Sequence, residues 1–277
     1  MNKIDIRSMS FDELSAVVST LGQPSFRTGQ IFSWLQSGVT HWDEMTNIPA
    51  VLRAKLAEGY YIVTANIKKR LESVIDDTVK YLYEMHDGEL VESVLMKYNH
   101  GYSLCISTQV GCRMGCSFCA TGLYGLTRNL TASEMLAQIT SAERDKGIRV
   151  SNVVLMGMGE PLDNFDNVVR FLQLVSDERG LNIGMRHISL STCGLADQID
   201  KLAQHRLQLT LSVSLHAPDD ETRSHLMPVN RSVGVEKLMA ACRRYFQTTG
   251  RRISYEYAMI DGVNDTLAHP DQLAGLV

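Results

Sequence analysis

Along the first 58 residues, apolar side chains recur three to four positions apart, the spacing of one buried helix face. The first stretch follows Ser10, which forms the pattern of a helix-starting capping box with Glu13. Two further helices are predicted over about residues 27–36 and 49–58. The pattern therefore predicts a small helical domain at 1–58.

The period changes to two between residues 59 and 98, which is typical of strands. Three strands are predicted, at 61–67, 78–85 and 89–98, and Asp87-Gly88 marks a tight hairpin between the last two. On the third strand, Glu92 shares a face with three apolar side chains: Leu90, Val94 and Met96. A carboxylate there is costly unless it is paired or functional. Glu92 is therefore either in an ion pair at an edge or part of a catalytic site, on a β-extension at 59–98.

From residue 99 to 277, strands alternate with loops and helices, a pattern that favours parallel strands covered by helices. Five such units are expected, with strands at 103–108, 152–156, 187–192, 209–215 and 252–260. In this architecture ligands collect at the carboxyl ends of the strands. The residues that follow each strand are therefore the first candidates for chemistry.

Composition places the chain among soluble globular proteins with a sizeable core, since 44% of its 277 residues are hydrophobic and 21% are charged. No apolar run approaches the roughly 20 residues that a membrane span needs. The N-terminus lacks an apolar signal segment, so a cytoplasmic location without a membrane partner is expected. The net charge of −4 offers no global attraction for nucleic acid. Local basic clusters could contact phosphates or be ordinary solvated charge: Lys68-Lys69-Arg70, Arg243-Arg244 and Arg251-Arg252.

Three of the six cysteines lie within eight residues, at spacing C-x3-C-x2-C: Cys112, Cys116 and Cys119. This clustering is unlike a disulfide scaffold and suits metal or redox chemistry. Three thiolates are one short of the four that usually hold a [4Fe–4S] cluster, so one iron would stay open. Zinc is an alternative, with a fourth ligand from His100, Cys105 or Cys193. A third interpretation is that the cysteines are simply buried as small apolar side chains.

The other predicted strands also end in small or polar residues. These are Gly159 and Glu160, then Ser191-Thr192-Cys193-Gly194, then Ser214-Leu215-His216, and finally Asp261, Gly262 and Asn264. Each group alone could be a turn or a helix cap. Their shared position at strand ends favours a single site.

Together these motifs resemble a known superfamily. Cys112-x3-Cys116-x2-Cys119 followed by Ala120-Thr121-Gly122, with Gly157-Met158-Gly159-Glu160-Pro161, is similar to radical S-adenosylmethionine enzymes. Four more stretches resemble the dual-specificity ribosomal and transfer RNA adenine-C2 methyltransferases, whose relatives include an adenine-C8 methyltransferase: Gly22-Gln23-Pro24-Ser25-Phe26-Arg27, Ser191-Thr192-Cys193-Gly194, Ser214-Leu215-His216-Ala217-Pro218 and Met227-Pro228-Val229-Asn230. The resemblance implies an α/β fold. It would be a partial (β/α)6 barrel lacking its last strand, with a small N-terminal helical domain and a β-hairpin extension.

The resemblance also implies roles for individual residues. Cys112, Cys116 and Cys119 would bind a [4Fe–4S] cluster. S-adenosylmethionine would be bound by Gly159, Glu160, Ser191, Ser214, Leu215 and His216. Glu92 would be the proton acceptor, and Cys105 would form a transient disulfide with a C-terminal cysteine.

The reaction implied is formation of 2-methyladenine in 23S rRNA and in tRNA next to the anticodon, by a ping-pong mechanism through a methylated cysteine. That cysteine, a sixth strand and a cofactor-contacting asparagine would lie beyond Val277, so these 277 residues are expected to bind a cluster without turnover. The implied partners are 23S rRNA, tRNA and an electron donor such as flavodoxin, with the protein a monomer. The alternatives are adenine-C8 methylation and an inactive metal-binding fragment that binds RNA.

Overall fold

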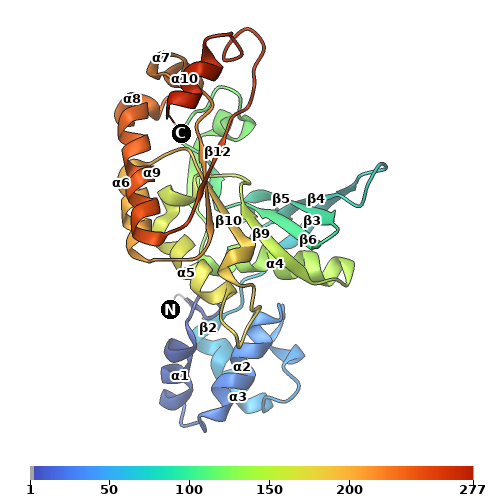
Figure 1. Cartoon of the computed structure of the whole chain (residues 1–277). Coiled ribbons are helices and arrows are strands. Elements are labelled where there is room, and N and C mark those ends of the chain that lie inside the picture. Colours follow the sequence, from blue (N-terminus) through green and yellow to red (C-terminus); the bar gives the residue numbers. More distant parts are fainter. Residues whose placement is uncertain (1–2, 277) are drawn as a thin grey trace. The chain divides into compact units, whose positions relative to one another are not determined.

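The computed structural model describes residues 3–276, which form two compact units (Figure 1). Unit 1 comprises residues 3–106, 130–153 and 166–184, and unit 2 comprises 107–129, 154–165 and 185–276. The chain passes between the units several times, so each is built from segments distant in sequence.

Unit 1 begins with the predicted helices. They are α1 (Phe11–Thr20), α2 (Phe26–Gln36) and α3 (Ala50–Gly59), and the short strands β1 (Ile4–Asp5) and β2 (Tyr60–Tyr61) pair in parallel beside them. Ser10 caps α1 as expected, because its hydroxyl accepts from the Glu13 amide while the Glu13 carboxylate accepts from the Ser10 amide. The apolar faces of the helices are buried together, which confirms the predicted helices.

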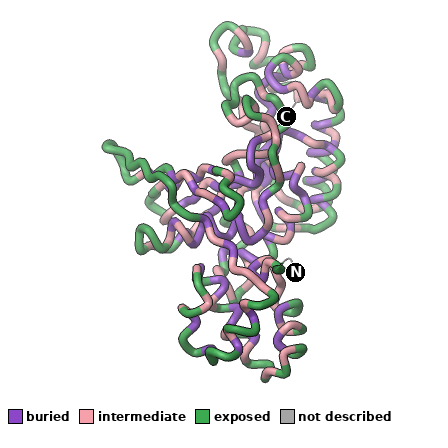
Figure 2. Tube along the Cα trace, turned by 180° about the vertical axis from the view of Figure 1, so that it is seen from behind, coloured by how far each residue is buried: buried purple, intermediate pink, exposed green. Residues whose placement is uncertain are grey.

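The sheet of unit 1 has the strand order β9-β6-β5-β4-β3. Its strands are β3 (Asn66–Glu72), β4 (Val79–Glu84), β5 (Leu90–Tyr98), β6 (Gly101–Ile106) and β9 (Val150–Leu155), of which β3 to β6 are antiparallel. The last two residues of β9 belong to unit 2. The outer part of the β3–β4 hairpin is exposed (Figure 2).

The strand predicted at 61–67 is wrong, because residues 62–65 belong to no strand. The carbonyl of Val63 accepts from Arg7, and that of Ala65 accepts from the hydroxyl of Ser141. Side chains therefore take the place that a neighbouring strand would occupy, and alternation of apolar residues alone cannot reveal this.

Helix α4 (Ala132–Lys146) covers one face of this sheet and starts at Thr131 with the predicted capping box. Ser93 donates to the Gln138 side chain at 2.7 Å, and the Tyr83 hydroxyl donates to the Gln138 carbonyl at 3.2 Å. Helix α5 (Phe165–Val175) lies mostly in the same unit. The face of β5 that α4 covers is thus the one opposite to Glu92.

Unit 2 contains three parallel strands in the order β12-β11-β10: β10 (Ile188–Thr192), β11 (Thr210–Ser214) and β12 (Ile253–Glu256). Helices α6 (Ala196–Gln204) and α9 (Val235–Thr249) pack side by side (Figure 1). The antiparallel pair β7 (Gln109–Gly111) and β8 (Leu126–Asn129) flanks the cysteine loop. The predicted α/β class with parallel strands is confirmed.

The remaining helices of unit 2 are α7 (Asp220–Leu226), α8 (Asn230–Val233) and α10 (His269–Leu276). The sequence pattern did not indicate α7 and α8. Among the described residues, no helix combines the length and apolar character needed to cross a membrane.

Candidate active site

The three clustered cysteines lie on a loop that glycines and backbone hydrogen bonds hold in shape. Gly111 has φ +76°, and a Cβ there would lie 1.9 Å from the Gly125 carbonyl oxygen, so only glycine fits. The Cys112 amide donates to that same carbonyl at 2.8 Å, and the Ser117 amide donates to the Leu226 carbonyl at 2.9 Å. Both ends of the loop are therefore anchored.

All three thiols face one cavity of about 260 Å³ in unit 2. Burial and the neighbouring Cys119 and Cys112 raise the pKa of Cys116 to about 11, and burial also raises that of Cys112. A bound metal cluster would have to displace these protons, as thiolate ligation generally requires. No group of three or more His, Cys, Asp or Glu in the described chain converges as for one metal ion. A four-iron cluster does not need such convergence, because each thiolate binds a different iron.

Glu160 lies across the cavity from the loop and is only 4% exposed. One carboxylate oxygen accepts from the Thr192 hydroxyl at 2.8 Å and the Leu162 amide at 3.0 Å, and the other accepts from the Cys193 amide at 2.7 Å. A carboxylate offers about four acceptor positions, so one remains for a ligand. Burial raises the pKa of Glu160 despite these donors, and a cationic ligand would compensate for that cost.

The Gly157–Pro161 turn is held against Gln109, which the sequence reading did not single out. The Gln109 side chain accepts from the Glu160 amide at 2.8 Å and donates to Asn129 at 2.8 Å and to Asp163 at 3.1 Å. Gly159 has φ +100°, and a Cβ there would lie 2.5 Å from the Gln109 Cβ. The contact explains the glycine and places Glu160.

We expect Gly159→Ala to destabilise the protein by about 2 kcal/mol or more, because it adds a clash to an unfavourable φ. Gly250→Ala is the matched control: it also has positive φ, at +68°, but nothing lies within 4 Å of its added Cβ. Chemical denaturation compares the two. An equal loss of unfolding free energy in both variants would contradict the close contact between Gly159 and Gln109.

Two of the predicted serines converge on a carboxylate that the sequence reading missed. Ser191 at the end of β10 and Ser214 at the end of β11 each donate to Glu256 Oε2 at 3.3 Å. Glu256 is the last residue of β12, and it lines the same cavity. A signal was present, since a carboxylate stands at the end of a strand, but only the parallel pairing brings it beside both serines.

His216 follows β11 with an unusual backbone, φ +57°. Its Nδ1 accepts from the Ala258 amide at 3.0 Å, and its carbonyl accepts from the Asn264 side chain at 2.6 Å. The ring meets Phe118 of the cysteine loop edge to face, with centroids 4.9 Å apart. Burial, with a smaller effect of Arg223, lowers the pKa of His216 to about 4. The imidazole is therefore neutral, and Nε2 carries the proton.

Arg223 on α7, 0% exposed, holds the strand ends from behind and was not indicated by the sequence. Its guanidinium donates to four acceptors: the carbonyls of Leu215, Ser214 and Cys193 and the side chain of Asn230. Leu215 is buried and positions its neighbours rather than lining the cavity. Arg223 thus ties β10 and β11 together below the cavity.

The structure brings eight of the predicted site residues to this one cavity: Cys112, Cys116, Cys119, Gly159, Glu160, Ser191, Ser214 and His216. Of the loop predicted after the last strand, Asn264 is buried and bridges the carbonyls of His216 and Ala258. Its role is thus to hold the His216 turn.

Glu92 and Cys105 belong to unit 1. They lie on neighbouring strands and share a face, since Val94 pairs directly with Cys105. That face is half-exposed rather than buried, and Lys80 Nζ lies 2.9 Å from Glu92 Oε1. The ion pair considered from the sequence is therefore present. None of the six cysteines, Cys105 included, is in a disulfide bond in the described residues.

Three residues of the basic clusters form ion pairs with carboxylates. Arg70 pairs with Asp145, Arg244 pairs with Asp200, and Lys68 pairs with Glu84. These contacts favour ordinary surface charge over phosphate binding at those positions.

Two sequence models of known families match the chain. The model of the Radical SAM superfamily matches residues 106–269. The model described as the ribosomal RNA large subunit methyltransferase N-terminal domain matches residues 4–62.

Individual relatives agree with both. A protein of Lachnoclostridium phytofermentans is 50% identical over 276 residues, 99% of this chain and 78% of that protein. A protein of Alkaliphilus oremlandii is 51% identical over 265 residues, which cover 96% of this chain and 77% of that protein. Both are described as probable dual-specificity RNA methyltransferases RlmN. The crystal structure of a radical SAM methyltransferase from Sphaerobacter thermophilus superposes with a TM-score of 0.93 at 43% identity, covering 99% of this chain and 81% of that one.

Proposed function

We propose that this protein, which belongs to the radical SAM superfamily and within it to the RlmN family, methylates C2 of adenine in 23S rRNA and in tRNA. The observation that carries the proposal is the cavity of unit 2, where the cysteine loop faces Glu160 and the ends of β10 to β12. A zinc site would not explain why the strand ends gather around the cysteines.

The chain's own residues would divide the work of binding. Cys112, Cys116 and Cys119 would hold three irons of a [4Fe–4S] cluster and leave the fourth open. The free acceptor position of Glu160 suits the ammonium group of S-adenosylmethionine. A [4Fe–4S] cluster held by these cysteines would supply the electron for reductive cleavage of S-adenosylmethionine.

The strand ends would hold the remainder of the cofactor. Ser191, Ser214 and Glu256 form a polar group at the ends of their strands, and neutral His216 adds one N–H donor. Leu215 acts through the backbone that Arg223 anchors. These groups are suited to hydroxyl and amine groups of a nucleoside.

A base and a thiol are needed to complete methylation at C2, an electron-poor carbon that ordinary methyl transfer does not reach. Glu92 is our candidate for the proton acceptor, oriented by Lys80. Cys105 is our candidate for the thiol that forms a disulfide and releases the product.

We also propose a division of labour along the chain: an RNA-docking helical domain at 1–58, a β-extension at 59–98 and a radical SAM core at 99–277. The matches at 4–62 and 106–269 support these boundaries. We further propose that the electron comes from a donor such as flavodoxin, and that the protein is monomeric and cytoplasmic.

Deleting the gene in its host should remove 2-methyladenine from both 23S rRNA and tRNA, as measured by mass spectrometry of the digested nucleosides. Complementation with the intact gene should restore it, whereas a Cys112→Ala gene should not. Loss of 8-methyladenine instead would identify the alternative regiochemistry. Unchanged methylation of both RNAs would overturn the proposed function.

A further inference from the structure

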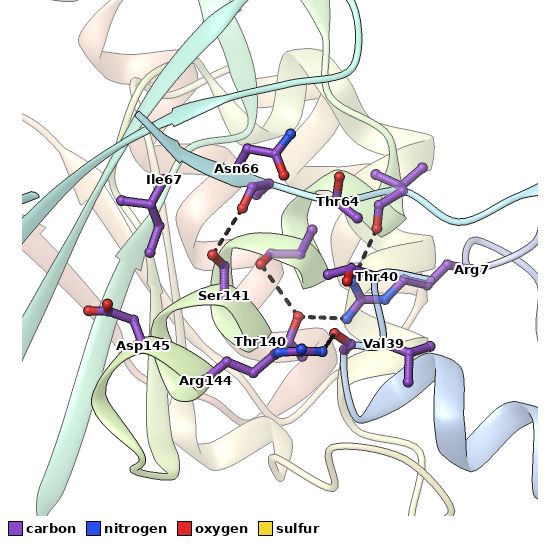
Figure 3. A pocket seen from close by; sticks show the side chains of 14 residues that line it. Arg7, Val39, Thr40, Thr64, Asn66, Ile67, Thr140, Ser141, Arg144 and Asp145 are labelled. Carbon is purple, nitrogen blue, oxygen red and sulfur yellow. Dashed lines mark hydrogen bonds between the residues drawn. The ribbon is translucent and has the colours of Figure 1, made fainter. Parts of the chain in front are cut away.

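A cavity of about 370 Å³ in unit 1 has no part in the site above. It lies among the N-terminal segment, the irregular residues 63–65, β3 and α4 (Figure 3). Val39, Val63, Ile67 and Ala137 form apolar walls, and Arg7, Arg144 and Asp145 contribute charges.

Arg7 is the unusual member of this set. It is 2% exposed, yet among the described residues it forms no ion pair with a carboxylate. Nη2 donates to the Thr140 hydroxyl at 2.9 Å, Nη1 reaches the Val63 carbonyl only at 3.5 Å, and buried Nε has no hydrogen-bond partner. A buried guanidinium with unused N–H groups is costly unless an anion compensates for its charge.

The other charged groups of the cavity already have partners. Arg144 donates to the Gly38 carbonyl at 2.7 Å and pairs with Glu44 at 3.0 Å, and Asp145 pairs with Arg70 at 2.9 Å. The Asp5 carboxylate accepts from the Arg7 backbone amide at 3.0 Å, and it and Glu143 raise the pKa of Arg7, whereas burial, the larger effect, lowers that pKa to about 10. Arg7 therefore stays charged at neutral pH, and among the described residues its guanidinium group contacts no carboxylate.

Both guanidinium groups are brought to the same wall. Gly38, whose carbonyl holds Arg144, packs directly against Thr140, which holds Arg7, since a Cβ on Gly38 would lie 2.4 Å from the Thr140 Cβ. Figure 3 shows Arg7 and Arg144 reaching toward Thr140. Arg144 is already paired with Glu44, so Arg7 is the guanidinium group at this wall that is suited to oxygens of a phosphate.

We propose that this cavity binds a phosphate group, with Arg7 as its charged anchor and Thr64 and Asn66 beside it as hydrogen-bonding groups. The apolar walls leave room for a nucleoside attached to the phosphate. The source that we favour is a nucleotide of the RNA substrate, and this part rests on the proposed function. Within the surface clusters that looked like phosphate contacts in the sequence, Arg70 and Arg244 are already paired with carboxylates, whereas Arg7 has no such pair among the described residues.

The test is Thr64→Glu, which places a carboxylate on the cavity wall next to Val63, whose carbonyl contacts Arg7. The new charge should weaken inorganic phosphate binding by at least about tenfold, through repulsion and occupation of Arg7. Because it supplies the missing partner, it should not lower the thermal midpoint of the unliganded protein. Ala54→Glu on α3 adds the same charge at an exposed position away from the cavity, and should leave phosphate binding unchanged.

The measurements are the phosphate-induced shift in thermal midpoint and the anisotropy of a labelled adenine-containing RNA hairpin, both without cluster or S-adenosylmethionine. Loss of both signals in Thr64→Glu, with a salt slope lower by about one for RNA, identifies an RNA phosphate. Loss of the phosphate signal alone identifies a free phosphate or small phosphorylated molecule. Equal phosphate shifts in Thr64→Glu and Ala54→Glu, or none in the unmodified protein, would overturn the proposal.

Arg7→Met provides a second line of evidence. This variant should lose the phosphate-induced shift, and its thermal midpoint without phosphate should be lower than that of the unmodified protein. Arg7→Lys keeps the charge and should restore part of the shift. Since neither readout depends on methyl transfer, failure of the proposed function would leave a positive result intact. A negative result for phosphate binding would likewise leave the proposed function intact.

Discussion

Replacing Cys116 with alanine should abolish assembly of a four-iron cluster and, with it, reductive cleavage of S-adenosylmethionine. Cys116 lines the cavity beside Cys112 and Cys119, and no other cysteine lines that cavity except Cys193. Cys193 cannot take its place easily, because it is buried and its amide is engaged by Glu160. Iron and sulfide analysis after anaerobic reconstitution measures assembly, and release of 5′-deoxyadenosine under reduction measures cleavage.

Cys242→Ala is the matched control for this experiment. Cys242 is a buried thiol of the same unit, on α9 and outside the cavity, so its removal should cost stability without loss of iron. If Cys116→Ala retained the full iron content and cleavage, the assignment of the cysteine loop would be wrong. A colourless, zinc-loaded unmodified protein would also contradict the assignment.

Replacing Arg223 with methionine should destabilise the protein by about 3 kcal/mol or more. The change leaves four buried hydrogen-bond acceptors without their donor, and each unsatisfied acceptor costs about 1–3 kcal/mol if no water replaces the donor. The affinity for S-adenosylmethionine should fall as well, because the carbonyls of Cys193 and Ser214 lose their shared anchor. Denaturant unfolding and isothermal calorimetry measure the two effects.

Arg244→Met serves as the comparison: Arg244 forms an exposed ion pair with Asp200, so its loss should leave the stability almost unchanged. Arg223→Lys should recover only part of the loss, because an ammonium group cannot reproduce the planar fork that reaches acceptors on two strands. Equal losses for Arg223→Met and Arg244→Met would refute a structural role for Arg223.

The local elements of this protein follow from short stretches of sequence. The capping boxes at Ser10 and Thr131 start α1 and α4 as predicted, because their partners lie three residues away. The Asp87-Gly88 hairpin is also as predicted, since Gly88 adopts φ +85°. Signals of this range need no knowledge of the fold.

The candidate site was predictable to the extent that its residues stand at strand ends. In a parallel sheet those ends share one edge, so Ser191, Ser214 and His216 could be grouped before the structure was known. The roles of Glu92 and Cys105 remain proposals, although their common face follows from the observed register.

By itself, the sequence determined the helices other than α7 and α8, the parallel α/β core, the spacing of the cysteine loop and the family. The tertiary structure alone decided the partners of Gln109, Glu256, Arg223 and Arg7, and it replaced the strand predicted at 61–67 with a segment held by side chains. The reason is physical: a periodic pattern records which face of an element is buried. The partner of a buried polar group depends on which distant segment the fold brings within hydrogen-bonding distance.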